Sequence, residues 1–323
     1  MKKLTLPLIM IFLLVLSACG NGKSADISST SPSASPSATT APASASPAAS
    51  NSDTITYQSE NGPVEVPAHP KRVVVLSSYA GSVLALGVPV VGVDSWAKMN
   101  PRFEDKLKDA VEVSDENIEK ILELEPDLII GLSTIKNVDK LKEIAPTVTF
   151  TYGKLDYLAQ HVEIGKLLNK GEEAQAWADD FRKREQEAGD EIRAKLGQNT
   201  SVSVIENFSK QLYLYGDHWG RGTEILYQGM KLVMPDKVKE ATTKDGYFAL
   251  SAEVLPDYTG DYLIVSKDPD TDNSYQDTET YKTIPAVKNQ HVLEVPMKEF
   301  YFNDAITLEY QLETFKEFFL GHK

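Results

Sequence analysis

The residue types best suited to chemistry gather in one stretch of the sequence, between Tyr213 and Arg221. A short run typical of a strand, Tyr213-Leu214-Tyr215, is followed by a glycine and then by Trp219 and Arg221. Ligand sites of open α/β sheets lie in loops that follow strands. There a guanidinium group can donate two hydrogen bonds to ligand oxygens, while Tyr and Trp cover apolar parts. The same residues could instead pack on their own core, with the arginine in a salt bridge. The pattern therefore predicts either a pocket for an oxygen-rich ligand or a packed loop.

Other aromatic residues follow predicted strands elsewhere in the chain and are further pocket candidates. Their assignment rests on position alone, because each would also suit packing in the core or at a rim. In the first half of the chain they are Tyr79, Trp96 and Tyr152, and in the second half Tyr247, Tyr275, Phe300 and Tyr301.

Sequence motifs for catalysis and for metal binding are missing. The chain has no G-x-S-x-G elbow, no H-E-x-x-H pair and no G-x-x-x-x-G-K-[ST] phosphate loop. Its histidines stand singly and Cys19 is its one cysteine, which argues against a Cys/His metal cage. Residues 268–279 place acids as in a calcium loop, but Asn273 stands where that loop needs glycine. We expect neither an enzyme nor a metal ion held directly by the protein.

Charge excludes another class of partner. Among 323 residues, 47 are acidic and 33 basic, a formal net charge of −14. Nucleic-acid binding needs a basic face, so we expect no nucleic-acid partner. The length allows two domains.

The N-terminal residues indicate export and anchoring. A positive start, Lys2-Lys3, precedes an apolar run over 4–16 that is shorter than the roughly 20 residues of a membrane span. Residues 1–18 are therefore a predicted signal peptide. The sequence Leu16-Ser17-Ala18-Cys19 resembles a bacterial lipobox, which implies that Cys19 is lipid-modified and becomes the mature N-terminus. The alternative is an ordinary signal peptide with a stray cysteine. We expect a protein lipid-anchored to the cell membrane on its extracytoplasmic face.

Composition and periodicity divide the rest of the chain. Residues 19–52 are mostly Ser, Ala, Pro and Thr and are expected to form a disordered linker, because they cannot bury enough apolar surface. The predicted N-terminal lobe, 53–155, alternates strands with helices after a hairpin around Asn61-Gly62. Residues 156–197 read as a helical connector that Gly171 interrupts, leaving a second helix of roughly 25 residues. The alternation resumes over 198–323, the predicted C-terminal lobe. The pattern predicts an α/β fold of two Rossmann-like lobes joined by one long rigid helix.

The order of several segments carries a family resemblance. The chain resembles the substrate-binding lipoproteins of ABC importers for iron–siderophores and vitamin B12. The segments that carry it are 64–67 with 70–74, 85–88, 118–121 with 126–130, 145–147, 219–222, 255–265 and 303–309. The resemblance implies a ligand cleft between the lobes, no cofactor, a monomer, and delivery to a permease with its cytoplasmic ATPase.

The resemblance also assigns residues. The Trp219-x-Arg221 pair is similar to that of hydroxamate-siderophore receptors, so the expected ligand is a ferric siderophore that itself holds the iron. In the family, one glutamate on each lobe docks to permease arginines, which points to Glu119 and Glu253. An acid in a first helical turn can also simply favour the helix dipole.

Alternative functions stay open. A receptor of the same fold could take a catecholate siderophore, haem or cobalamin. A catecholate chelate carries more negative charge and would need several basic residues at the cleft, where the sequence predicts only Arg221. An extracytoplasmic enzyme or sensor domain on this scaffold is the alternative outside the class.

Overall fold

The computed structural model describes residues 53–321. The predicted signal peptide and the whole predicted linker, including Cys19, lie outside the described residues. The first part is a hairpin of β1 (Thr54–Ser59) and β2 (Gly62–Pro67), which turns through Glu60 and Asn61, one residue before the predicted Asn61-Gly62.

The N-terminal lobe is built on a parallel sheet of five strands in the order β5-β4-β3-β6-β7. Its strands are apolar runs because helices and loops cover both faces; all three residues of β3 are buried. The strands are β3 (Val73–Val75), β4 (Val90–Val93), β5 (Val111–Glu112), β6 (Leu128–Leu132) and β7 (Thr147–Phe150). The helices are α1 (Ala80–Ala85), α2 (Ser95–Met99), α3 (Glu104–Leu107), α4 (Ile118–Glu123) and α5 (Val138–Lys142), with a 3-10 turn η1 (Pro101–Phe103).

The C-terminal lobe has a mixed sheet in the order β10-β9-β8-β11-β12. β8 (Val202–Phe208), β11 (Tyr262–Lys267) and β12 (Val292–Pro296) are parallel, whereas β9 (Gln211–Tyr215) and β10 (Tyr247–Leu250) are antiparallel to their neighbours. A π-helical turn, η2 (Glu224–Gly229), follows the loop after β9. The helices are α8 (Asp236–Thr242), α9 (Glu279–Thr283), α10 (Pro285–Lys288), α11 (Met297–Phe300) and α12 (Ala305–Leu320), with 3-10 turns η3 (Leu255–Tyr258) and η4 (Ser274–Asp277).

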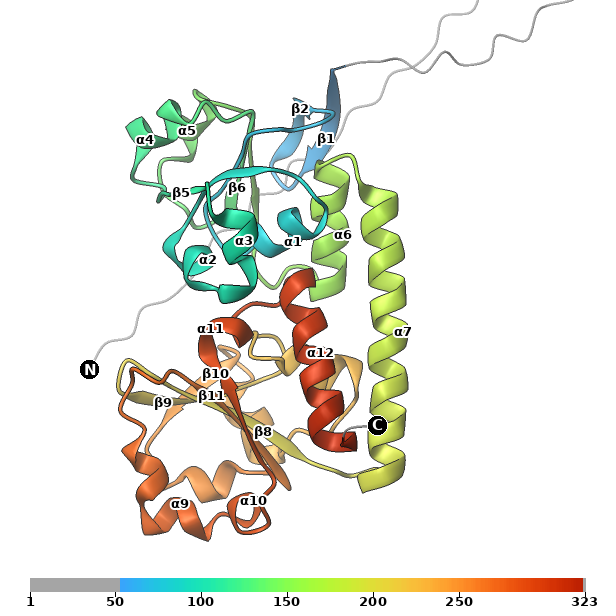
Figure 1. Ribbon diagram of the computed structural model, residues 1–323, viewed down its shortest axis with the longest axis vertical. Coiled ribbons are helices and arrows are strands. Elements are labelled where there is room, and N and C mark those ends of the chain that lie inside the picture. Colours follow the sequence, from blue (N-terminus) through green and yellow to red (C-terminus); the bar gives the residue numbers. More distant parts are fainter. Residues whose placement is uncertain (1–52, 322–323) are drawn as a thin grey trace, which may run out of the picture. The chain divides into compact units, whose positions relative to one another are not determined.

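Two helices connect the lobes, α6 (Tyr157–Leu167) and the 26-residue α7 (Gly171–Leu196). At 1.5 Å per residue α7 is about 39 Å long, and it runs alongside both lobes (Figure 1). Its apolar face packs on α6 and α12. On α12, Glu309 accepts hydrogen bonds from Trp177 Nε1 at 2.9 Å and Arg184 Nη1 at 2.7 Å. The prediction of two α/β lobes with one long helix is confirmed.

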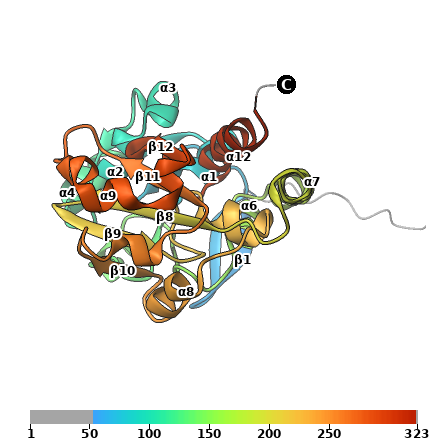
Figure 2. The same cartoon turned by 90° about the horizontal axis from the view of Figure 1, so that it is seen from below.

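A second link between the lobes is the segment before α12. Phe302 lies in the apolar core of the N-terminal lobe and stacks on Phe103, with ring centroids 5.9 Å apart. Asp304 accepts hydrogen bonds from the backbone of Ile306 and Thr307, which caps α12, and its carboxylate lies against α1 at Gly81. A Cβ atom at Gly81 would collide with that carboxylate. Figure 2 shows α12 beside α7 and α8 beside β10.

A buried acid on α7, Glu185, contacts both the start of α6 and the turn η2 of the C-terminal lobe. Both carboxylate oxygens of Glu185 lie 2.6 Å from the Tyr157 hydroxyl at the start of α6, and the side chain also abuts Gly229 of η2. Burial raises the pKa of Glu185 from 4.5 to about 7, more than the hydrogen bond from Tyr157 lowers it.

This pKa makes stability depend on pH. Between pH 4.5 and 7 the folded state binds the Glu185 proton more tightly than the unfolded state, so stability falls as the pH rises through that window. Glu185→Gln removes the titration and keeps an acceptor for Tyr157. Its free energy of unfolding, relative to the natural protein, should therefore rise by about 2–3 kcal/mol from pH 4.5 to pH 8. Denaturant titrations across this range measure the difference, and parallel curves for the two proteins would contradict it.

Candidate functional site

An aromatic pocket of about 280 Å³ lies between the lobes. The N-terminal lobe and the loop after it supply Ser78, Leu132 and Tyr152, and the C-terminal lobe supplies Trp219, Arg221, Tyr301, Phe302 and Asn303. Below we call this cavity the aromatic pocket. Its lining is mostly apolar with a few polar groups, as is usual for small-molecule sites.

Strand ends explain most of this lining. Ser78 follows β3, Leu132 ends β6 and Tyr152 follows β7, all at the carboxyl edge of the parallel sheet, where open α/β sheets bind ligands. Tyr301 follows β12 and the short α11. The loop with Trp219 differs, because β9 is antiparallel to β8. That loop returns across the sheet to Glu206 of β8, which Arg221 contacts.

Arg221 is held in a buried ion pair. Its Nη2 donates to Glu206 Oε1 at 2.7 Å and its Nε to Glu206 Oε2 at 3.2 Å, while Nη1 donates to the Trp219 carbonyl oxygen at 3.0 Å. The guanidinium carbon lies 4.6 Å and 4.2 Å from the ring centroids of Tyr215 and Tyr301. These bonds use three of the five N–H groups of the guanidinium. Arg221 thus forms the salt bridge of the packing alternative and also lines the pocket.

The loop around Arg221 has an unusual backbone. Gly220, Arg221 and Gly222 have φ angles of 71°, 57° and 82°, three successive residues in the left-handed region. The Arg221 backbone N–H donates to the Phe300 carbonyl at 2.8 Å, and Gly220 lies so close to Tyr301 that a Cβ atom would collide with its carbonyl oxygen. The ion pair and these contacts together fix the position of Trp219.

Aromatic contacts close the pocket across the lobes. The Tyr152 ring meets Trp219 edge-on at 5.6 Å, and the Tyr152 hydroxyl donates to the His218 carbonyl oxygen at 3.3 Å. Trp96 after β4 stacks on Tyr301 with centroids 4.6 Å apart and lies 6.0 Å from Phe208 at the end of β8. Such pairs favour offset or edge-on geometry.

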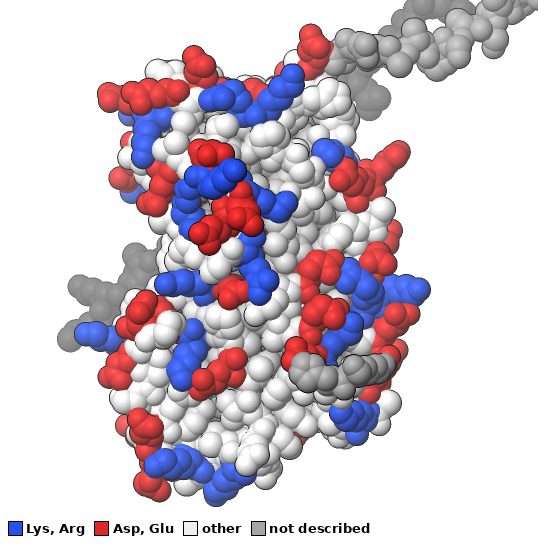
Figure 3. All heavy atoms as spheres, viewed as in Figure 1, with Lys and Arg blue, Asp and Glu red and all other residues white. Residues whose placement is uncertain are grey.

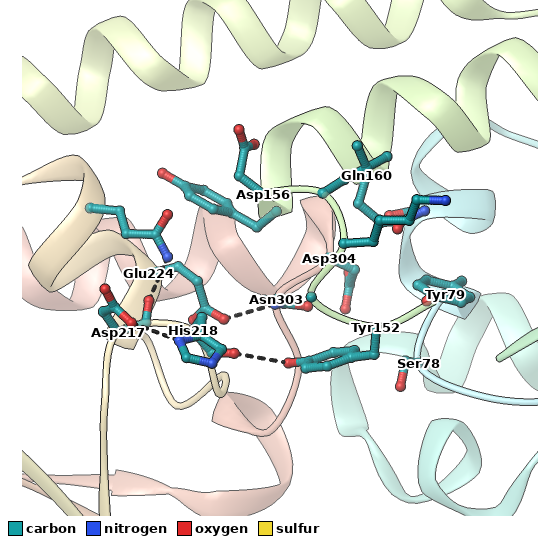
Figure 4. Close-up of a pocket in the computed structure, with 16 residues that line it drawn as sticks. Ser78, Tyr79, Tyr152, Asp156, Gln160, Asp217, His218, Glu224, Asn303 and Asp304 are labelled. Atoms are coloured by element: carbon teal, nitrogen blue, oxygen red, sulfur yellow. Dashed lines mark hydrogen bonds and ion pairs between the residues drawn. The ribbon is translucent and has the colours of Figure 1, made fainter. Parts of the chain in front are cut away.

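A second cavity, the polar pocket of about 330 Å³, adjoins the first toward the connector (Figure 4). The two cavities share Ser78, Tyr152 and Asn303. The rest of its wall is mainly polar: Tyr79, Ser82, 153–157, Gln160, Asp217, His218, Glu224, Gln228 and Asp304.

The structure brings most of the predicted pocket residues together. Tyr152, Trp219, Arg221 and Tyr301 line the aromatic pocket, Trp96 backs it, and Tyr79 lines the polar pocket. Tyr247 lies 5.1 Å from Trp219 and Tyr213 lies 5.8 Å from Tyr247, which extends the aromatic surface outward.

Two predicted residues lie elsewhere. Phe300 is fully buried between Tyr310 and Phe315 in the core of the C-terminal lobe. Tyr275 packs on Tyr281 beside a separate groove.

Several residues in or beside the site were not predicted from the sequence. Phe208 ends a strand, so the strand-end rule that selected Trp96 would have found it. Asn303 comes soon after Tyr301, but a polar residue in a loop gives no signal of its own. Glu206 lies inside a buried strand, and a lone acid there would have indicated a buried partner.

Other features of the described residues bear on function. Within residues 53–321, no three His, Cys, Asp or Glu side chains gather as a metal site, and no helix is long and apolar enough to cross a membrane. On the face in Figure 3, basic side chains are interspersed with acidic ones.

Comparison with known proteins identifies the family. A sequence profile described as "periplasmic binding protein" matches residues 73–298, more than half of the chain. The chain belongs to the periplasmic binding protein family. This family consists of substrate-binding proteins and is not a family of enzymes.

Three relatives of this binding protein are informative. It is 34% identical to the iron(3+)-hydroxamate-binding protein FhuD of Bacillus subtilis, over 95% of this chain and 94% of that protein. The structure of FhuD2 from Staphylococcus aureus with bound ferrioxamine B matches with a TM-score of 0.74, at 34% identity over 78% of this chain and 98% of the other. The binding-protein component of a Fep/Fec-like ferrichrome ABC transporter from Bacillus subtilis matches with a TM-score of 0.72, at 35% identity over 81% and 99%.

The ion pair predicts a large stability effect at Arg221. Arg221→Ala would leave the Glu206 carboxylate buried without its counter-charge, which costs about 3–5 kcal/mol when one partner is removed. In Arg221→Ala/Glu206→Gln the lost charge is matched, so part of the stability should return. Denaturant unfolding of both variants, beside Trp219→Phe as a control that leaves the pair intact, measures the effect. Equal stability of Arg221→Ala and the natural protein would contradict this role.

Proposed function

We propose that this binding protein captures a ferric siderophore of the hydroxamate type and delivers it to the permease of an ABC importer. The observation that carries the proposal is the aromatic pocket between the lobes, with Trp219 and Arg221 on one wall and Tyr152 on the facing one. In a ferric trihydroxamate, the core of three hydroxamates around Fe³⁺ has no net charge, and it combines apolar linkers with outward oxygens. Aromatic faces suit the linkers, and the remaining guanidinium N–H groups suit the oxygens. The iron arrives already chelated, so the protein needs no metal ligands of its own.

The charge of the pocket favours hydroxamates over catecholates. A ferric tris-catecholate carries three negative charges and needs several basic groups around it. In the described part of the chain, Arg221 is the one basic residue lining the aromatic pocket, and Glu206 already balances it. The relatives named for hydroxamate chelates support the same ligand class.

The first test is at Trp219. Trp219→Ala should weaken binding of ferrioxamine B by roughly 1–3 kcal/mol through lost apolar cover, and Trp219→Phe should recover part of it. Isothermal titration calorimetry gives the affinities, and thermal melting shows that the variants are folded. Trp177→Phe on α7, away from the pocket, is the matched control. If folded Trp219→Ala binds the chelate as tightly as the natural protein, the ligand lies elsewhere.

We also propose that Glu119 and Glu253 dock the permease. Glu119 is exposed on α4 of one lobe, and Glu253 is exposed in the turn before η3 of the other. The Ser251 hydroxyl helps to hold the pKa of Glu253 below its usual value, which keeps it charged. Exposed aliphatic side chains lie next to both acids, Leu122 at 58% and Val254 at 43% exposure. Each lobe thus offers a charge beside an apolar contact.

Docking predicts a separation of binding from transport. The double variant Glu119→Ala/Glu253→Ala should keep the natural affinity for ferrioxamine B but lower its uptake on the order of ten-fold, since exposed charges act on encounter and orientation. Uptake of radioactive iron as ferrioxamine B by cells expressing each variant measures the effect. Glu104→Ala/Glu240→Ala removes exposed acids of the same two lobes that lie outside α4 and η3, as a control. Full uptake by the first double variant would exclude this docking role.

A lipid anchor at Cys19 would keep the receptor near its permease. Cys19→Ala should abolish lipid modification and either release the protein from membranes or leave its signal peptide uncleaved. Membrane fractionation and the mass of the mature protein distinguish these results from normal anchoring. Unchanged retention with normal processing would contradict the proposal.

A further inference from the structure

The polar pocket contains more negative charge than its surroundings balance. Four carboxylates line it, those of Asp156, Asp217, Glu224 and Asp304. Glu224 is 1% exposed and accepts hydrogen bonds only from neutral groups, the Gly220 backbone and the side chains of Asn303 and Thr223.

Asp304 is similarly uncompensated. It is 4% exposed, and its hydrogen-bond donors are the backbone of Ile306 and Thr307 and the Thr307 hydroxyl. Among the described residues, no lysine, arginine or histidine forms an ion pair with Asp304 or Glu224. Burial raises the pKa of Asp304 to about 6, so at neutral pH it is ionised against an unfavourable environment. Buried charge without a partner is costly.

Two basic side chains line this pocket, and each already has a carboxylate partner. Lys154 forms an ion pair with Glu60 at 3.2 Å, and His218 Nδ1 lies 2.6 Å from Asp217. The pocket therefore keeps a negative charge even with its whole lining counted.

A second observation points to a ligand. Tyr79 lines this pocket, the residue is only 5% exposed, and its buried hydroxyl oxygen has no hydrogen-bond partner within the described chain. Nearly all buried polar groups in proteins are hydrogen-bonded. Figure 4 shows Tyr79 and Asp304 on one side of the cavity and Glu224 and Asp217 on the other.

We propose that the polar pocket binds a positively charged arm, such as a primary ammonium group, of a ligand whose chelated core occupies the aromatic pocket. The inference rests on the proposed function and deepens it. An ammonium group has three N–H donors and no acceptor, which matches carboxylates and a phenol oxygen. The shared lining at Ser78, Tyr152 and Asn303 places the arm next to the core. The balanced Arg221–Glu206 pair suits a neutral core, and the unbalanced pocket suits a cationic arm.

Two chelates that differ only in the arm test the proposal. Ferrioxamine B ends in a free ammonium group, and its N-acetylated derivative ends in a neutral amide. At low ionic strength the natural protein should bind ferrioxamine B about ten-fold more tightly than the acetylated form in calorimetric titrations. Added salt should reduce this preference, because partly exposed charges are screened.

Variants of the polar pocket test whether its side chains cause the preference for ferrioxamine B over the acetylated form. Glu224→Gln and the double variant Asp156→Asn/Asp217→Asn should each bring the ratio of the two affinities toward one, while the acetylated chelate binds as before. Asn still caps α6 at position 156, so the double variant carries the test if Glu224→Gln does not fold. Tyr79→Phe, which removes only the hydroxyl, should lower the ratio a few-fold. Glu313→Gln on α12 removes a carboxylate outside the pocket and should leave the ratio unchanged.

The outcomes separate the two proposals. If neither chelate binds, the proposed function is wrong. If both bind the natural protein equally, or if the preference persists in all the pocket variants, the receptor function stands and the subsite proposal is overturned.

Discussion

The buried ion pair between Arg221 and Glu206 is the interaction on which the geometry of the site depends. Arg221 Nη2 and the Tyr215 hydroxyl donate to one carboxylate oxygen of Glu206, and Arg221 Nε and the Ser266 hydroxyl to the other. Four donors thus meet the roughly four acceptor positions of a carboxylate. Because both charges are satisfied inside the lobe, the pair can hold Arg221 in the left-handed conformation, which its glycine neighbours adopt freely but which is unfavourable for other residues. The position of Trp219 is the result.

The two cavities share a wall but differ in electrostatics. In the aromatic pocket, the one guanidinium has its carboxylate partner. In the polar pocket, the two buried carboxylates, those of Glu224 and Asp304, accept hydrogen bonds from neutral groups alone. Tyr152 stands between them, contacting His218 and Trp219 of the opposite lobe. Tyr152 therefore lies between a neutral, aromatic environment and an anionic one. A ligand that occupies both pockets needs a neutral part for the first and a positively charged part for the second.

Local sequence pattern is enough to predict the elements that depend on it. Ala174, Trp177, Phe181, Ala188 and Ile192 recur at helical spacing after Gly171, and α7 runs from Gly171 to Leu196 as that periodicity indicates. Strand β10 escaped prediction because it is a short, half-exposed edge strand, and its antiparallel pairing depends on the neighbouring strand.

In the candidate site, the sequence also does not predict which way single side chains point. Phe300 and Tyr301 are adjacent, yet one packs inside the lobe and the other lines the aromatic pocket. Neighbours in a helical turn point in different directions, and position after a strand does not choose between them. The partner of Arg221 is fifteen residues earlier in the chain, brought close by a loop that doubles back over an antiparallel strand. The spacing of the two residues in the sequence therefore does not predict their ion pair.

The rigid link between the lobes has a consequence for transport. Three features oppose a wide hinge motion between the lobes. The long helix α7 runs along both of them, Phe302 packs in the core of the N-terminal lobe, and Asp304 contacts α1. If Glu119 and Glu253 dock the permease as proposed, a protein built this way presents them at nearly the same separation whether it is loaded or empty. Empty copies would then occupy the permease as competitors of loaded ones, so the rate of import depends on the ratio of the two populations at the membrane.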